Sequence, residues 1–513
     1  MHALQRVQQA ATAVGILGLL SPIAVAASYV CDTIASTTNI ELETPFTIQW
    51  TTEQSHYWSS ACSNLHPSCI LYPETADEVS AIVRVLNNST EKFAIKSGGH
   101  NPNLYYSSIE GGPLLSTAKL NEVLLDPTTQ TVRVGPGNRW NDVATALDGT
   151  GFSAVGGRLG VVGVGGYLLG GGLSFMSTEY GWATDSVLAF DVVFANGSIA
   201  TVTADNHPDL FVSMRGGGNA FGIVTAFTLQ AYPQGDVWGG NIIFSSDEGS
   251  NAKVLAALNN FALDYPDEKA AIIATAEVTL QGLLPLWVVY FYYNAPKPPA
   301  GVFDEFLAIT ALLNTCKTRS YADLLYTNGQ AGGQTGVVQL GSEMSSLPQG
   351  PVDGVGNRTT AGLHVFQEYF DYWQEVSKTL LVVPGILSSI AFQPIPRGMA
   401  RIAKEKGGDL LDLDDTLDRV ILEFTMSFTL QTDTPYMESK MEEMYGGIRE
   451  RVLNFTEQGI LPESYLPLFY NDAFYEQEFS ARLRPENAER ARTLRQEVDP
   501  ADLFLNRTGG FKL

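Results

Sequence analysis

A short glycine turn carries a histidine that could do chemistry near neutral pH. The segment Lys96-Ser-Gly-Gly-His-Asn-Pro102 follows the apolar run Phe93-Ala-Ile95, which predicts a strand. Gly98 and Gly99 permit positive φ and leave backbone N–H groups unobstructed, so the turn can hold an anion. His100 ends the turn with an imidazole that can act as a base, a ligand or a nucleophile. The segment therefore indicates an anion-binding loop with a reactive histidine.

A long glycine-rich run indicates a second place where backbone lies against a ligand. It spans Gly156–Gly172, and Val, Leu and Tyr are interleaved with its glycines. A flexible linker would carry Ser, Pro and charge instead. A Rossmann fingerprint that begins at Gly163 would need glycine where Leu168 stands, and no Gly-Lys-Ser/Thr follows to make a P-loop. These residues predict an ordered phosphate-binding loop and leave its type open.

Several blocks occur together in a fixed order along the chain. They are Ser97–His100, Val162–Gly172, Asp209–Phe211, Arg215–Thr225 and Asp499–Phe504. This set resembles the FAD-linked oxidases of the vanillyl-alcohol oxidase type, with a PCMH-type FAD-binding domain, in the berberine-bridge-enzyme-like branch. The resemblance runs from near Cys62 to the end of the sequence and is densest over residues 92–230.

The resemblance implies an α+β protein of two domains. Residues 62–233 would form the FAD-binding domain, which consists of two small α+β subdomains with the cofactor between them. Residues 234–460 would form a substrate domain, an antiparallel β-sheet backed by helices, and residues 461–513 would return to the first domain. The length agrees, because the chain is too long for a single hydrophobic core.

Hydrophobic periodicity predicts the local elements. A helix is expected over 77–86, with Thr75 as its N-cap and Glu78 as its capping-box partner. Asn196-Gly197 between two apolar runs predicts a β-hairpin. The other expected elements are a helix over 140–147, strands at 69–72, 114–115, 132–134, 238–245, 285–293 and 418–430, helices at 251–264, 302–313 and 486–497, and exposed loops at 294–301, 328–336 and 345–356.

The family resemblance assigns the residues of the site. His100 matches the histidine that becomes covalently attached to the 8α-methyl group of the flavin. The pyrophosphate would lie on the backbone of Ser97, Gly98, Gly99, Gly165, Gly166, Gly170 and Gly171. Ile223 and Val224 match the segment at the adenine end, Asn471 is the candidate contact of the flavin ring, and Tyr470 is the candidate catalytic base. The aromatic residues Trp287, Tyr290 and Tyr292 either line the pocket or belong to the core.

Leu159 distinguishes this chain from doubly linked members of the family. Those members carry a second flavin link through a cysteine in a Gly-x-Cys-x-x-Val-Gly pattern, and Leu159 occupies the cysteine position here. The expectation is a single histidyl link. The expected function is oxidation of a small organic molecule, a natural-product intermediate, with hydride passing to FAD and O2 reoxidising it. The alternatives are a secreted carbohydrate or alcohol oxidase and a non-catalytic secreted glycoprotein with the same fold.

The remaining features predict a secreted protein. Residues 1–27 have the basic, apolar and small-residue layout of a signal peptide, and a membrane anchor is the alternative. Of the four cysteines, which lack metal-site spacing, the resemblance favours a Cys31–Cys69 disulfide, with Cys62–Cys69 as the alternative. N-glycosylation sequons stand at Asn87, Asn88, Asn196, Asn357, Asn454 and Asn506. The net charge of −24 argues against nucleic acid or an anionic membrane as a partner, and we expect a monomer.

Overall fold

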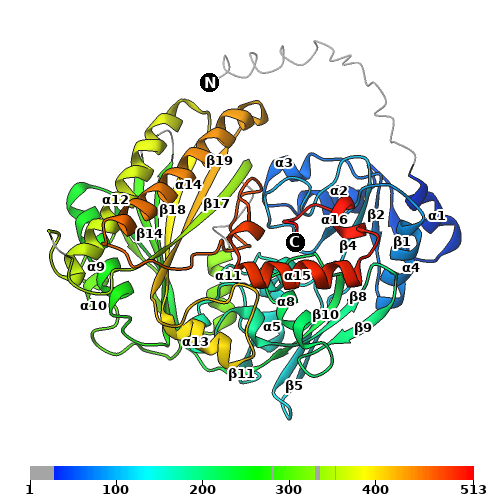
Figure 1. Ribbon diagram of the computed structural model, residues 1–513, viewed down its shortest axis with the longest axis horizontal. Coiled ribbons are helices and arrows are strands. Elements are labelled where there is room, and N and C mark those ends of the chain that lie inside the picture. The colour runs from blue at the N-terminus through cyan, green and yellow to red at the C-terminus, as the bar shows by residue number, and fades with distance from the viewer. Residues whose placement is uncertain (1–27, 280–281, 283, 330–335, 353) are drawn as a thin grey trace, which may run out of the picture.

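The computed structural model describes residues 28–279, 282, 284–329, 336–352 and 354–513. The predicted signal peptide at 1–27 and most of the predicted loop at 328–336 lie outside these residues. Three main β-sheets with their covering helices build the described part of the chain (Figure 1). No helix in these ranges is both long enough and apolar enough to cross a membrane.

The first sheet delivers the chain to the His100 turn. Its strands, in spatial order, are β1 (Glu41–Glu43), β2 (Cys69–Tyr72), β4 (Pro113–Ser116) and β3 (Ala94–Lys96). Strands β2, β4 and β3 are parallel, and α1 (Tyr29–Thr37) and α4 (Ala76–Asn87) contribute to the core beside them. The Cys31–Cys69 disulfide joins α1 to β2, so the expected pairing is present, and Cys62 and Cys316 are free thiols.

Helix α4 begins at the predicted N-cap, but its capping box is only half formed. The Thr75 hydroxyl accepts a hydrogen bond from the Glu78 N–H at 3.2 Å, as expected. The Glu78 carboxylate, however, accepts from the N–H of Glu74 at 2.6 Å rather than from that of Thr75. The Glu78 side chain therefore bonds to the backbone one residue further back than in a full capping box. It still satisfies one backbone N–H group that has no partner within the helix.

The second sheet is antiparallel and forms the opposite wall of the same domain. Its strands, in spatial order, are β5 (Val123–Asp126), β6 (Thr131–Val134), β10 (Ile223–Gln230), β8 (Val187–Val193) and β9 (Ile199–Val202). The predicted Asn196-Gly197 hairpin joins β8 and β9, with Val193 paired to Ile199. Helices α5 (Trp140–Leu147) and α8 (Pro208–Met214) belong to this part of the chain, and β7 (Phe152–Ser153) pairs with β11 (Tyr232–Pro233) below it.

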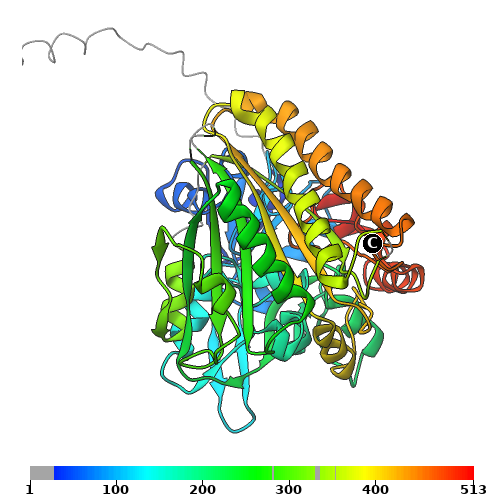
Figure 2. The ribbon, with the colours of Figure 1, turned by 90° about the vertical axis from the view of Figure 1, so that its left-hand side faces the viewer.

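The third sheet is the predicted antiparallel sheet backed by helices. Its strands, in spatial order, are β15 (Leu313–Asn314), β12 (Val237–Ser245), β14 (Leu284–Tyr293), β13 (Ala270–Thr279), β18 (Leu387–Ile395), β19 (Arg419–Phe428) and β17 (Val337–Ser346), and β16 (Lys317–Arg319) also pairs with β12. Three long helices, α9 (Glu248–Leu263), α12 (Arg358–Thr379) and α14 (Thr434–Glu457), cover one face (Figures 1 and 2). The other face turns toward the first domain.

The aromatic residues of β14 belong to the core. Trp287 is fully buried and stacks on Phe370 of α12, with ring centroids 5.3 Å apart. Tyr292 points to the opposite face and stacks on Phe175 at 5.4 Å. A cavity of about 320 Å³ lies between the sheets, and neither these two residues nor Tyr290 is among the described residues that line it. The core interpretation therefore holds for Trp287 and Tyr292.

The prediction of a helix over 302–313 is wrong, because the helix in the structure is much shorter. The structure has a single turn there, α10 (Asp304–Leu307), and the chain then pairs with the edge of β12. The Leu312 N–H donates to the Ile243 carbonyl at 2.7 Å, and the Thr315 N–H donates to that of Asn241 at 2.9 Å. An unpaired sheet edge offers these backbone groups partners, so tertiary pairing overrides the local helical pattern.

The final segment packs on the first domain. The remaining helices are α2 (Ile48–Ser55), α3 (Ser60–Ser63), α6 (Val164–Leu169), α7 (Ser177–Tyr180), α11 (Tyr321–Gly329), α13 (Arg397–Glu405), α15 (Pro485–Val498) and α16 (Leu503–Arg507). Helix α15 packs against α8 of the first domain, and Leu503 and Phe504 of α16 belong to the core beside the first sheet. The Phe93 N–H donates to the Arg507 carbonyl at 2.9 Å, just before β3. We propose on this basis that the domain boundary lies near residue 233, where the first two sheets end.

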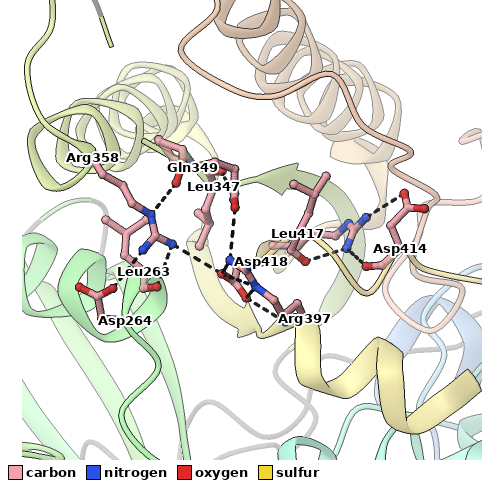
Figure 3. Close-up of polar contacts among 11 residues, drawn as sticks. Leu263, Asp264, Leu347, Gln349, Arg358, Arg397, Asp414, Leu417 and Asp418 are labelled. Carbon is pink, nitrogen blue, oxygen red and sulfur yellow. Dashed lines mark hydrogen bonds and ion pairs between the residues drawn. The ribbon is translucent and has the colours of Figure 1, made fainter. Parts of the chain in front are cut away.

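A network of charged groups fixes the start of β19 (Figure 3). The buried Asp418 carboxylate lies 2.5 Å from the Arg397 guanidinium and 3.5 Å from that of Arg358. Arg358 also donates to the Leu263 carbonyl at the end of α9, at 2.9 Å, and pairs with the exposed Asp264. The network therefore ties α9, α12 and α13 to the strand that enters the site.

Replacing Asp418 with asparagine should lower the free energy of unfolding by about 2 kcal/mol, because two guanidinium groups lose a buried carboxylate. Urea unfolding measures this change. Asp264→Asn is the matched control, since its side chain is 80% exposed and surface pairs contribute less than about 1 kcal/mol. Equal losses in the two variants would contradict this assignment.

Candidate cofactor-binding and active site

One cavity of about 320 Å³ lies where the three sheets meet. Its wall includes Ile95 and Ser97 from the first sheet and the turn after it, Ile223 and Val224 from β10, and Glu423 from β19. The predicted site residues Ser97, Gly98, Gly99, His100, Gly165, Gly166, Ile223, Val224, Tyr470 and Asn471 all line it. The fold thus brings together residues that are far apart in the sequence.

Close backbone contact explains the glycines of the His100 turn. A Cβ on Gly98 would lie 2.5 Å from the backbone of Gly163, and a Cβ on Gly163 would overlap Gly98 in return. Gly99 has φ +70°, which favours glycine. The Ser97 hydroxyl donates to the Pro136 carbonyl at 2.5 Å and accepts from the Gly165 N–H at 3.1 Å. The His100 turn and the glycine run therefore form one rigid cradle.

The His100 imidazole is neutral and unpaired. Burial, and then the charge of Arg139, lower the pKa of His100 to about 4. The Arg139 guanidinium is fixed beside the turn, because it donates to the Gly98 carbonyl at 3.1 Å. Within the part of the chain that the structure describes, neither imidazole nitrogen makes a hydrogen bond. A neutral ring with a free nitrogen lone pair that faces a cavity has the properties of a nucleophile.

Two of the predicted pyrophosphate contacts, Gly170 and Gly171, are not at the cavity wall. A Cβ on Gly170 would overlap the Asn471 amide, and Gly171 turns the chain with φ +107° beside Phe469. The Asn471 amide donates to the Gly166 carbonyl at 3.1 Å and accepts from the Gly172 N–H at 3.0 Å. Asn471 thus uses its amide to hold the glycine run, and Gly170 provides the space for it.

The geometry does not favour Tyr470 as the base. Its hydroxyl accepts hydrogen bonds from the backbone N–H groups of Asn219 and Phe511, and burial raises the pKa of Tyr470. The ring packs edge-on against Phe511, with centroids 5.1 Å apart. A Cβ on Gly218 would overlap the hydroxyl. Tyr470 therefore packs between the 508–511 segment and the cavity wall, and its hydroxyl is bonded to backbone groups.

An acid pair at the cavity wall has the properties that Tyr470 lacks. Glu423 and Asp472 line the cavity and hydrogen-bond each other, and burial raises the pKa of both carboxyl groups. The Gln393 amide donates to Glu423 at 3.1 Å and to Asp472 at 3.3 Å. The positive charge of Arg158, also at the wall, partly opposes the rise. Two carboxyl groups this close share one proton and leave one site to accept another.

A signal for Glu423 was present in the sequence. In the strand Val420-Ile-Leu-Glu-Phe-Thr-Met-Ser-Phe428, polar residues at every second position alternate with large apolar ones. The apolar set faces the helices, and Glu423 and Thr425 face the cavity. A carboxylate is rarely found on a buried strand unless it is paired or functional.

The cavity has the character of a site for a large phosphorylated cofactor. Glycine backbone lines one side, an imidazole with no hydrogen bond to any described residue faces the space, and apolar residues such as Leu159 and Phe227 line the rest. The glycine cradle leaves room for a pyrophosphate that backbone amides can bind. The residues at this site therefore fit FAD.

Comparisons with known proteins agree with this architecture. The profile of the family described as FAD binding domain matches residues 67–203. An uncharacterized FAD-linked oxidoreductase of Arthroderma benhamiae is 39% identical over 92% of this chain and 93% of its own length. The FAD-dependent monooxygenase drtC of Aspergillus calidoustus is 30% identical over 90% and 85%.

A solved structure shares the fold. Berberine bridge enzyme from Eschscholzia californica superposes with a TM-score of 0.72 at 17% identity, over 94% of this chain and 98% of that chain. The architecture is that of a PCMH-type FAD-binding enzyme with a helix-backed substrate sheet. The chain belongs to the family of FAD-linked oxidoreductases, with the fold of berberine bridge enzyme, and it is an FAD-dependent oxidoreductase.

Proposed function

We propose that this enzyme is an oxidase that carries FAD on a single covalent link through His100. The observation that carries the proposal is the neutral, unpaired His100 imidazole at the glycine-lined cavity. Leu159 lines the same cavity and has no nucleophilic atom, so a thioether cannot form at that position. Ser97, Gly98, Gly99, Gly165 and Gly166 would hold the pyrophosphate, and Ile223 and Val224 would meet the adenine end. When bound, FAD supplies the capacity to accept a hydride and to pass electrons to O2.

The acid pair supplies the proton acceptor for the reaction. Glu423 lies on β19 of the third sheet and Asp472 on the C-terminal segment, and both line the cavity, where a substrate would face the cofactor. Loss of a hydride from a C–H bond next to a hydroxyl or amine releases a proton, and a shared-proton pair can accept it near neutral pH. Gln393 and Arg158 orient and tune the pair. We propose an organic natural-product intermediate as the substrate, with H2O2 as the second product.

Secretion is part of the proposal. The Cys31–Cys69 disulfide is typical of an oxidising compartment, and all six sequon asparagines are exposed. We propose that residues 1–27 act as the signal peptide and that the mature enzyme works as a monomer on a small molecule and O2. Digestion of the secreted protein with an endoglycosidase, followed by mass measurement, tests which sequons carry glycans.

The His100 link is tested by acid precipitation of the wild type and of His100→Ala. The wild type should give a yellow pellet and a mass increase equal to one FAD, and His100→Ala should release all of its flavin. Cys62→Ser is the matched control. Cys62 lies beside the turn, with its sulfur 3.4 Å from the Pro102 carbonyl, and burial raises its thiol pKa to about 12. This variant should keep the flavin. Flavin that washes off the wild type would refute the covalent link.

A further inference from the structure

We infer that Trp58 is a positioning residue that holds the His100 imidazole in the orientation that bonding to FAD requires. This inference rests on the proposed His100 link. The indole of Trp58 stacks on the imidazole with ring centroids 4.4 Å apart and planes inclined by 3°. Both side chains line the cavity. The stack is therefore a nearly parallel, face-to-face contact at the reacting residue.

A stacked ring can fix the orientation of an imidazole and leave its nitrogen atoms free to react. The lone pair of an imidazole nitrogen lies in the plane of the ring, so a partner on the ring face leaves the nitrogen free. A hydrogen bond would fix the ring too, but it would use one of the nitrogens. Within the described residues His100 has no such bond, and Trp58 is the aromatic ring found against it. The orientation of the imidazole thus depends on the indole.

The backbone that carries the indole is held on both sides of Trp58. The backbone N–H of Trp58 donates to the Gly99 carbonyl at 3.0 Å, inside the His100 turn. The preceding residue, Tyr57, donates its hydroxyl to the Ser107 carbonyl at 2.7 Å. The following residue, Ser59, accepts from the Val338 N–H of β17 at 2.9 Å. Trp58 therefore sits on a rigid segment that spans the FAD-binding region and the substrate sheet.

The contribution of Trp58 is to orientation and not to electron transfer. In the net reaction an imidazole nitrogen bonds to the 8α carbon, and one N–H and one C–H hydrogen are lost. The two electrons and two protons pass to O2, which becomes H2O2. Orientation of a nucleophile beside its target can change such a rate by orders of magnitude. A ring free to rotate in the cavity would attach slowly while FAD still bound.

The test measures the rate of attachment separately from FAD binding. Full-length protein produced under flavin limitation is incubated with FAD, and acid-stable flavin is followed with time. Trp58→Met keeps apolar bulk but loses the flat face, and Trp58→Phe keeps a flat ring. We expect Trp58→Met to attach about 10- to 100-fold more slowly, with the dissociation constant of reversible binding changed by less than about threefold, and Trp58→Phe to recover most of the rate.

The pH dependence gives a second readout. The low pKa of His100 should keep wild-type attachment flat from pH 8 down to about 5. Trp58→Met uncovers one face of the imidazole and should raise the His100 pKa, although the charge of Arg139 still lowers it, so the rate of this variant should begin to fall at a higher pH than the wild-type rate. Trp50→Leu is the matched control, because Trp50 stacks on His66 at 6.0 Å, away from the cavity lining.

The outcomes separate the two hypotheses. A wild type without acid-stable flavin overturns both the His100 link and the role of Trp58. Attachment by Trp58→Met at the wild-type rate overturns the role of Trp58 alone. A loss of attachment that merely follows a loss of FAD binding also overturns it, because Trp58 would then form part of the binding wall.

Discussion

Glu423→Gln should lower kcat/KM by about 10²- to 10⁴-fold and leave the FAD content at the wild-type level. Glutamine keeps the shape of the side chain and can still hydrogen-bond Thr425 and Gln393, but it cannot accept a proton. The rate is measured as H2O2 release with the best substrate from a screen of alcohols and amines. Anaerobic bleaching of the flavin should slow by the same factor, because the lost step precedes reoxidation.

Glu277→Gln is the control for this prediction. Glu277 lies on β13 of the same sheet, and burial raises its carboxyl pKa, but it is not among the described residues that line the cavity. Its replacement should change kcat/KM by less than about threefold. A rate loss in Glu423→Gln no larger than that in Glu277→Gln would show that Glu423 is not the proton acceptor.

The activity of the wild type should rise with pH through the raised pKa of the acid pair, because a fully protonated pair has no site for the substrate proton. Stability should change in the opposite direction. The folded state binds more protons than the unfolded chain when a carboxyl pKa is raised, so stability falls as pH rises. Glu423→Gln removes part of that penalty and should melt at the wild-type temperature or above it at pH 8. An inactive variant that is also less stable would point to a structural role instead.

Gly166→Ala should abolish FAD binding without destabilising the protein. Gly166 lies within α6, at the cavity wall, and a Cβ built there meets no atom within 4 Å. Alanine is favoured over glycine in a helix by about 1 kcal/mol, so the melting temperature should stay or rise. The added methyl group would project into the space where the pyrophosphate would lie. Flavin absorbance of the purified protein and its melting curve measure the two effects.

Two further glycine variants are the controls for Gly166→Ala. Gly163→Ala should lose both FAD and stability, because its Cβ would overlap the Gly98 backbone. Gly446 lies in α14, and a Cβ built there meets no atom within 4 Å. Gly446→Ala should therefore keep both the FAD and the stability of the wild type. Retention of normal flavin by Gly166→Ala would mean that the cofactor does not approach this part of the glycine run.

The sequence was most informative where backbone geometry limits residue choice. Gly98, Gly99 and Gly163 are glycines because another backbone or a left-handed turn leaves no room for a side chain, and such positions are visible as a motif. The hairpin at Asn196-Gly197 and the Thr75 N-cap were predicted for the same reason, since the local residues determine the local conformation. The antiparallel sheet behind its helices followed from strand patterns and the family resemblance.

Side chains that act through partners distant in sequence could not be predicted in this way. Tyr470 adjoins Asn471, yet its hydroxyl is taken up by Asn219 and Phe511, which no local pattern reveals. The strand pattern marks Glu423 as an unusual carboxylate, but its role as a base depends on Asp472 and Gln393, which meet it in space. The helix predicted over 302–313 is shorter in the structure because its second half pairs with the edge of β12, which is distant in sequence. Trp58 also gains its importance from tertiary stacking alone.

The wall of the cavity draws on residues as early as Trp58 and as late as Gly510. Asn219 donates its amide to the Gly509 carbonyl at 3.1 Å, and Lys512 caps the carbonyls at the end of α16. A ribosome that has not passed residue 510 therefore has an open, incomplete site on the growing chain. We therefore expect capture of the cofactor to follow synthesis of both domains, and chains that stop before residue 510 to be colourless.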